Sequence, residues 1–260
     1  MAVVAPGLHT KDCQILRLLP LFFLMGSVLA HGQISTPLAC QEELHEGPEF
    51  TQAFANPKDD SVLPRVLLIG DSISIGYTVN VRKLLTGKAK VHRIPGNGQT
   101  ADFGVKNLPK WLGDKKWDVI HFNWGLWDLA YRHPDSKSQG KRDKVNGTVS
   151  NTPEQYREHL EQAVAILKKT GAKLIWCATT PVPEGEAGRH AGDAIRYNKV
   201  AADVMKKNGI AINDLHSHAL KRLPGIATRP GDVHFNKEGC DWLAEKVAAE
   251  ILQALPTQQK

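Results

Sequence analysis

From Arg65 onward, the chain alternates short runs of β-branched and other apolar residues with longer amphipathic stretches. This alternation is typical of a parallel β-sheet covered by helices, because each helix carries the chain back to begin the next parallel strand. The clearest run, residues 65–69 (RVLLI), is almost continuously apolar, as expected of a strand buried on both faces. We therefore predict an α/β domain in which helices cover a five-stranded parallel sheet.

Local signals set the bounds of the predicted elements. Thr152 before Pro153 is typical of a helix start, and Gly87 and Gly171 follow the last periodic residues of two helices. The predicted strands share β-branched and apolar character and span residues 65–69, 90–94, 117–122, 173–178 and 210–212. The predicted helices share amphipathic periodicity and span residues 73–85, 100–112 (opened by a Thr100 cap), 153–169, 192–207 and 236–252.

The N-terminal part has a different character. Lys11 and Arg17 precede an apolar run, residues 18–30, that ends in small residues suited to a signal peptidase. The run is too short to span a bilayer, which needs about 20 residues. We expect a secretion signal, then a Pro- and acid-rich lead-in, then one folded domain, at residues 1–30, 31–63 and 64–256. A secreted or periplasmic location follows from the signal.

Composition excludes several classes of protein. The 260 residues carry a net charge of +6, but no stripe of Lys and Arg with interleaved aromatic residues indicates a nucleic-acid partner. No apolar run is long enough to predict a membrane span. Without the signal, the remaining thiols are Cys40, Cys177 and Cys240, whose spacing predicts neither a metal site nor a disulfide framework. Cys40 and Cys240 could pair only if the two ends of the chain meet.

The residues that follow the strands are where chemistry is expected, because open parallel sheets bind ligands at the carboxyl ends of their strands. Residues 70–72 (GDS) directly follow the first strand, which places Ser72 at the start of the next helix. The helix dipole and the serine's own N–H can stabilise an oxyanion there. Taken alone, a serine in such a turn is more often a helix cap than a nucleophile.

A second segment strengthens the functional interpretation of Ser72. Residues 231–236 (GDVHFN) precede the last predicted helix and carry His234 beside Asp232. Both loops open on the same edge of the predicted sheet, so the imidazole can reach the serine hydroxyl.

These two segments, together with residues 96–100 (GNGQT), resemble the SGNH hydrolases, also called the GDSL esterase/lipase family. The resemblance runs over about residues 65–254 and implies a flavodoxin-like three-layer α/β/α fold with a Ser–His–Asp site. It implies that Ser72 is the nucleophile, that His234 is the base and that Gly98 is the oxyanion-hole glycine. It implies no metal and no organic cofactor. Asp71 is expected to brace the turn rather than to contact substrate.

Two departures from the family pattern concern catalysis. The family's Gly-x-Asn-Asp block is here residues 125–128 (GLWD), so Trp127 replaces the asparagine that donates to the oxyanion. Trp127 has one N–H to donate and Asn123 lies nearby, so either side chain, a backbone group or water can fill that position. The alternative is that both side chains only pack or cap the strand end.

The second departure concerns the acid. The family's aspartate lies three residues before the histidine, where this chain has Gly231, while Asp232 lies two residues before it. Either Asp232 orients His234, or a backbone carbonyl does so in a Ser–His dyad.

The resemblance implies a secreted serine esterase that forms an acyl-enzyme on Ser72, with a carbohydrate O-acetylesterase as the leading interpretation. The alternatives are a lipid or thioester acyl hydrolase and a glycan-binding protein without catalysis. Residues 132–151 carry more basic than acidic side chains, which favours an anionic polymer as substrate unless the loop is merely solvated. The aromatic residues of the third strand end, Trp124, Trp127 and Tyr131, predict either a sugar platform or core packing. The pair of His216 and His218 is interpreted as belonging to a surface helix rather than to a metal site.

Overall fold

A computed structural model of the chain describes residues 48–59 and 62–256. The expected secretion signal and Cys40 lie outside these residues, and the predicted domain, residues 64–256, lies wholly within them.

The central sheet has five parallel strands in the order β2-β1-β3-β6-β7. Its strands are β1 (Arg65–Ile69), β2 (Lys90–Arg93), β3 (Val119–Phe122), β6 (Lys173–Cys177) and β7 (Ala211–Asn213). This is the flavodoxin-like order, in which the chain moves outward from the first strand in one direction and then in the other. The predicted fold class is confirmed, and all four residues of β3 are buried, as a central strand requires.

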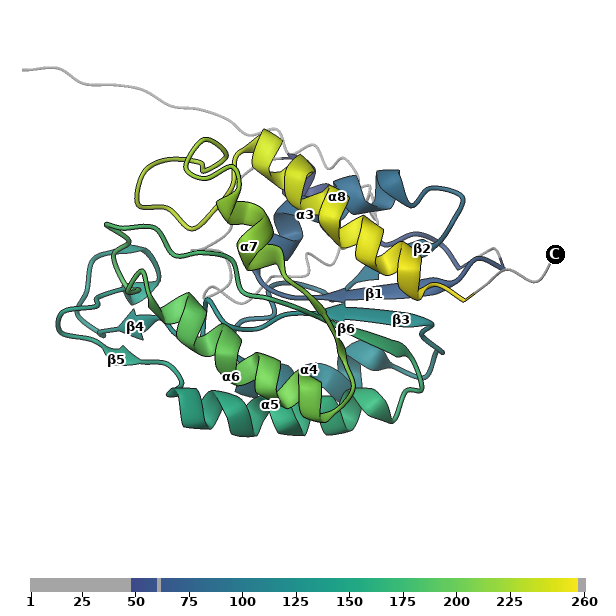
Figure 1. Cartoon of the computed structure of the whole chain (residues 1–260), viewed down its shortest axis with the longest axis horizontal. Helices are drawn as coiled ribbons and strands as arrows, with labels where there is room; N and C mark the ends of the chain where they lie inside the picture. Colours follow the sequence, from purple (N-terminus) through teal and green to yellow (C-terminus); the bar gives the residue numbers. More distant parts are fainter. Residues whose placement is uncertain (1–47, 60–61, 257–260) are drawn as a thin grey trace, which may run out of the picture. The chain divides into compact units, whose positions relative to one another are not determined.

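Helices cover both faces of this sheet (Figure 1). One layer consists of α2 (Pro48–Phe54), α3 (Ser72–Leu84), α7 (Leu215–Leu220) and α8 (Lys237–Ala254). The other layer consists of α4 (Ala101–Leu112), α5 (Pro153–Lys168) and α6 (Asp193–Lys207). Within the described ranges, every helix is too short or too polar to cross a membrane.

The helix starts follow mostly from capping side chains. Thr152 and Gln155 form a reciprocal capping box at α5, with N···O distances of 3.3 and 2.9 Å. Asn236 caps α8 by accepting the N–H of Gly239 at 2.9 Å. Thr100 occupies the cap position of α4 as predicted, but its side chain makes no capping hydrogen bond there.

The elements that the sequence did not predict are short. They are α2, α7, a 3-10 turn (Gln139–Lys141) and a two-stranded sheet of β4 (Tyr131–Arg132) and β5 (Thr148–Val149). Helix α2 lies in the expected lead-in, yet it packs on the domain: Arg82 of α3 donates to the carbonyl groups of Gln52 and Ala53 at 2.8 and 2.9 Å. The second half of the lead-in therefore belongs to the folded unit.

Candidate active site

Three loops meet at the carboxyl edge of the sheet. They follow β1, β2 and β3 and span residues 70–72, 94–100 and 123–128. Because β1 lies between β2 and β3, its loop has the other two as neighbours. This point, where the strand order reverses, is where open α/β sheets bind ligands.

Ser72 is the first residue of α3. Asp71 is the N-cap, and its carboxylate accepts the N–H of Ile73 at 3.0 Å, as the bracing role predicts. The N–H of Ser72 has no hydrogen-bond partner among the described residues, which is normal in the first turn of a helix. Ser72 thus presents an available N–H and a hydroxyl at the positive end of the helix dipole.

The histidine loop, residues 228–236, reaches Ser72 at the edge of the sheet. His234 Nε2 lies 2.9 Å from Ser72 Oγ, and His234 Nδ1 lies 2.7 Å from Asp232 Oδ1. The same carboxylate oxygen accepts the backbone N–H of His234 at 3.1 Å. The other carboxylate oxygen pairs with Arg229 Nε at 3.2 Å. The structure therefore brings Ser72, His234 and Asp232 into one continuous hydrogen-bond chain.

The spacing of Asp232 and His234 follows from a tight turn. Gly231 has a φ of 73°, a left-handed conformation that favours glycine over an aspartate. The N–H of Asp232 closes the turn on the carbonyl oxygen of Arg229 at 3.3 Å. The turn brings the carboxylate two residues before the imidazole to the Nδ1 side of the ring.

Arg93, the last residue of β2, lies behind the serine turn and was missed by the sequence analysis. Its buried guanidinium donates to the carbonyl groups of Gly70 and Asp71 at 3.0 and 3.2 Å. Its other acceptors, at distances of 2.6 to 3.2 Å, are Ser74 Oγ and the carbonyl groups of Ile94 and Gly96. Burial lowers the pKa of Arg93 to about 9, so the side chain stays charged at neutral pH. One guanidinium thus ties the serine turn to the loop after β2.

The resemblance predicts that the Gly98 N–H donates to an oxyanion, but in the structure it has another acceptor. Its N–H donates to the carbonyl oxygen of Gly70 at 2.9 Å, so that N–H is already engaged. A Cβ atom at this position would lie 2.8 Å from the same oxygen, which explains the need for glycine. The residue lets the two loops approach closely instead of presenting an unused donor.

The two candidate side-chain donors of the third loop also differ. Asn123 Nδ2 donates to the Cys177 carbonyl at 2.7 Å and to Thr179 Oγ1 at 3.3 Å, so both of its N–H bonds are engaged. Trp127 is 7% exposed, and its Nε1 has no hydrogen-bond partner among the described residues. The Arg132 guanidinium lies over the Trp127 ring at 4.7 Å. Of the two, only Trp127 keeps a donor unused.

Asp128 links the loop after β3 to the start of α4. This fully buried carboxyl group accepts the first N–H of α4, from Ala101, at 2.9 Å and the amide of Asn151 at 2.8 Å. Burial raises its pKa to about 7. Asp128 therefore supplies the capping hydrogen bond that the Thr100 side chain does not make.

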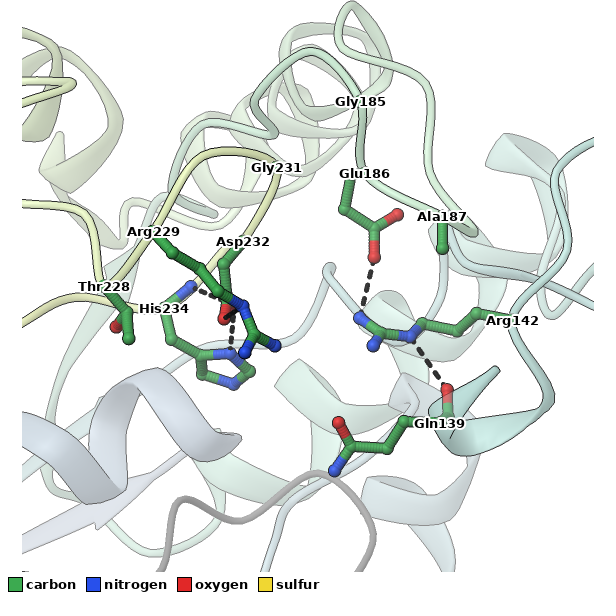
Figure 2. Close-up of a pocket in the computed structure, with 10 residues that line it drawn as sticks. All are labelled: Gln139, Arg142, Gly185, Glu186, Ala187, Thr228, Arg229, Gly231, Asp232 and His234. Carbon is green, nitrogen blue, oxygen red and sulfur yellow. Dashed lines mark hydrogen bonds and ion pairs between the residues drawn. The ribbon is translucent and has the colours of Figure 1, made fainter. Parts of the chain in front are cut away.

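A cavity of about 280 Å³ opens beside the imidazole (Figure 2). His234, Asp232 and Arg229 form one wall, while Arg142 and Glu186 approach from other segments. Most of the side chains around it are polar or charged, so it suits a polar ligand.

The other residues discussed in the sequence analysis do not belong to the hydrogen-bond chain of Ser72, His234 and Asp232. His218 Nε2 lies 3.1 Å from the carbonyl oxygen of Trp242, and the two rings stack at 4.1 Å, so this histidine packs between helices. In the described part of the chain, no three His, Cys, Asp or Glu side chains are grouped to hold a metal ion. Trp124 and Trp127 are buried in the core instead of forming an open platform for a sugar.

Comparison with solved structures identifies the class of fold. A lipase/acylhydrolase from Enterococcus faecalis is 21% identical, with a TM-score of 0.60 over 76% of this chain and 100% of that chain. An acetyl xylan esterase is 20% identical, with a TM-score of 0.58 over 72% of this chain and 99% of that chain. The acetylxylan esterase Axe2 from Geobacillus stearothermophilus is 18% identical, with a TM-score of 0.58 over 75% and 97%.

These structures show that the chain has the fold of GDSL-type acylhydrolases and esterases. No protein-family model matches the sequence, and no curated protein is similar to it. The assignment of an activity therefore depends on the geometry of the site.

Proposed function

We propose that this protein is a serine esterase that hydrolyses carboxylic esters through an acyl-enzyme on Ser72. The observation that carries the proposal is the hydrogen-bond chain from Ser72 Oγ through His234 to Asp232, with distances of 2.9 and 2.7 Å. An imidazole in this position can take the hydroxyl proton, while the carboxylate fixes its tautomer and stabilises the imidazolium. The fold shared with acylhydrolases and esterases supports the same class of reaction.

In the acylation step, His234 Nε2 takes the proton of Ser72 as Oγ attacks the carbonyl carbon of the ester. The carbonyl oxygen becomes an oxyanion, which accepts a hydrogen bond from the N–H of Ser72; as a second donor we propose Trp127 Nε1, the unused donor of the third loop. Both groups are without a partner among the described residues, and the dipole of α3 adds a favourable field. Collapse of the intermediate breaks the bond to the alcohol, which leaves with the proton held by His234.

Deacylation repeats these steps with water. His234 takes a proton from the water molecule, the hydroxide attacks the acyl carbon, and Ser72 Oγ leaves and regains a proton from the imidazolium. The products are the free acid and the alcohol, and no cofactor enters the balance.

For the substrate, we propose an O-acetyl ester of a carbohydrate. Two acetylxylan esterases are among the solved structures with this fold, and the cavity beside His234 has the polar lining that a sugar requires. A lipid acyl hydrolase is the second candidate, because lipases are also among those structures. The intact hydrogen-bond chain argues against a glycan-binding protein without catalysis.

The test is hydrolysis of chromogenic esters by the purified protein, with Ser72→Ala as the control. We expect turnover of the acetate ester and a fall of at least about 10⁴-fold in Ser72→Ala. A rate that decreases from acetate to octanoate supports the acetylesterase, whereas the opposite order supports the lipid hydrolase. Equal rates in both proteins contradict the proposal of an enzyme.

We also propose that residues 1–30 direct secretion, because a basic segment precedes the short apolar run. Mass spectrometry of the exported protein should find an N-terminus at His31. Retention of residues 1–30 in the exported protein contradicts this part of the proposal.

A further inference from the structure

We infer that the cavity beside His234 binds a carboxylate on the alcohol part of the ester, so that the preferred substrate is an acetylated acidic sugar such as a uronic acid. The inference rests on the proposed esterase function and adds the charge of its substrate. It follows from the position, the charged groups and the hydrogen-bond donors of the cavity.

The position of the cavity assigns it to the leaving alcohol. In an acyl transfer of this kind, the imidazole protonates the departing oxygen, so the alcohol lies against the base. The cavity includes His234 and Asp232 in its lining, but not Ser72. A group held there belongs to the alcohol and not to the acyl chain.

Both carboxylates that line the cavity are paired with arginines. Glu186, which is buried, accepts from Arg142 at 2.7 Å and from Arg189 at 3.0 Å. Asp232 pairs with Arg229 at 3.2 Å. The carboxylates of the lining are thus already paired, so the charged groups that can still receive a ligand are the guanidinium groups.

Two arginines of the lining keep unused donors. Arg142 uses Nε on the Gln139 carbonyl at 2.9 Å and Nη1 on Glu186, while its Nη2 has no partner among the described residues. Arg229 uses Nε on Asp232, and its two terminal nitrogens have no partner there either. Figure 2 shows the two guanidinium groups on facing walls, with His234 below Arg229. Planar guanidinium groups bind carboxylates with strong, charge-assisted hydrogen bonds.

The size of the cavity limits the ligand to a small group. Its volume of about 280 Å³ lies just under the range of pockets for drug-sized ligands, about 300–1,000 Å³. One sugar ring with its carboxylate is a ligand of this scale. A neutral sugar also fits, but it offers the two guanidinium groups no charged acceptor.

The test compares two substrates that differ in one group: O-acetylated methyl glucuronide and O-acetylated methyl glucoside. We expect the wild-type protein to have a kcat/KM at least about tenfold higher for the uronide, since hydrogen bonds to charged groups contribute about 1.5–3 kcal/mol. Arg142→Gln should remove this preference, because it lowers kcat/KM for the uronide by a larger factor than kcat/KM for the glucoside. Lys141→Gln, which removes an exposed charge from the neighbouring position, should behave as the wild type.

Two further measurements keep the test decisive. In the wild type, the preference for the uronide should shrink as salt is raised, because the charge interaction is screened. If Arg142→Gln does not fold, this salt dependence still tests the proposal. In Ser72→Ala, methyl glucuronide should bind more tightly than methyl glucoside by calorimetry, a readout that needs no turnover.

The outcomes separate this inference from the proposed function. Equal kcat/KM for the two esters, or a preference that persists in Arg142→Gln, overturns the carboxylate site and leaves the esterase intact. A preference that high salt leaves unchanged overturns it as well. No turnover of either ester, in both the wild type and Ser72→Ala, overturns the esterase itself.

Discussion

Ser72 and His234 reach the same point from two parts of the molecule that are built in different ways. The serine turn is buried, and it is held by Asp71, by Arg93 and by the close approach of Gly98. The histidine loop belongs to no regular element, and Arg229 on it is largely exposed. The Asp232 carboxylate orients the base through Nδ1 and the backbone N–H of His234.

The difference indicates a division of tasks. Acylation needs a nucleophile and oxyanion donors in fixed positions, because displacement of about 1 Å has a large effect on the rate. The buried serine side meets this need. The histidine side must also receive and release an alcohol of variable shape, and a short loop beside a cavity suits that task. Substitutions on the two sides should therefore have different effects on stability and on turnover.

The largest expected effect is on the histidine side and concerns turnover alone. Asp232→Asn should lower kcat by about 10⁴-fold, because the amide favours the wrong tautomer of the imidazole. The melting temperature should change little, because the amide has the size of the carboxylate and its oxygen can still accept the backbone N–H of His234. Steady-state kinetics and calorimetry on the same protein check both parts. A loss of less than about tenfold indicates a Ser–His dyad.

Arg93→Met should produce the opposite pattern on the serine side. The substitution leaves several buried acceptors without a donor, and each such group costs about 1–3 kcal/mol. We expect the free energy of unfolding to fall by at least about 3 kcal/mol, measured by urea denaturation. A variant as stable as the wild type contradicts the contrast between the two sides.

Asp128 should give the serine side a pH-dependent stability. Its pKa of about 7 in the folded protein lies above the ordinary 3.8, so the folded state binds this proton more tightly. The resulting stabilisation is present in full below pH 3.8 and is lost as the pH rises through 7.

Comparison with Asp128→Asn isolates this contribution, because the amide does not titrate. Relative to this variant, the unfolding free energy of the wild type should fall by up to roughly 4 kcal/mol from acid to neutral pH. Urea denaturation across this pH range measures the difference. Stability curves that stay parallel contradict the raised pKa.

A kinetic effect smaller than that of Asp232→Asn tests whether Trp127 donates to the oxyanion. Trp127→Phe keeps most of the ring's packing and removes Nε1, so kcat should fall by about 10²–10³-fold with KM little changed. Asn123→Ala is not a matched control, because it removes an amide and not an indole. Trp124→Phe is the better control, since its indole donates to the Gly98 carbonyl at 3.1 Å. Equal kinetic losses in both tryptophan variants indicate a packing role for Trp127.

The sequence predicted the long elements because their periodicity extends over whole helices and strands. It did not predict α2, β4, β5 or α7, which have at most seven residues each and leave no periodic pattern. The residues that would form the hydrogen-bond chain, Ser72, His234 and Asp232, were predicted because they follow or precede recognisable elements.

The direction of individual N–H groups could not be predicted in the same way. Whether Gly98 presents its N–H to a substrate depends on its distance from Gly70, and Asn123 turns toward the Cys177 carbonyl of a neighbouring strand. Both facts depend on contacts between loops. Arg93 was missed because a charged side chain at a strand end is usually exposed. Its burial follows from the carbonyl groups that the serine turn and the loop after β2 direct at it.

The left-handed conformation of Gly231 affects how the aspartate and the histidine of this protein can move. Because one tight turn carries both the carboxylate and the imidazole, the acid and the base move as a single body. A ligand or an antibody that binds residues 229–234 and shifts them would move both side chains away from Ser72, while Ser72 itself keeps its position. A longer connection between α7 and this turn would move Asp232 and His234 together. It would not change how their side chains face each other.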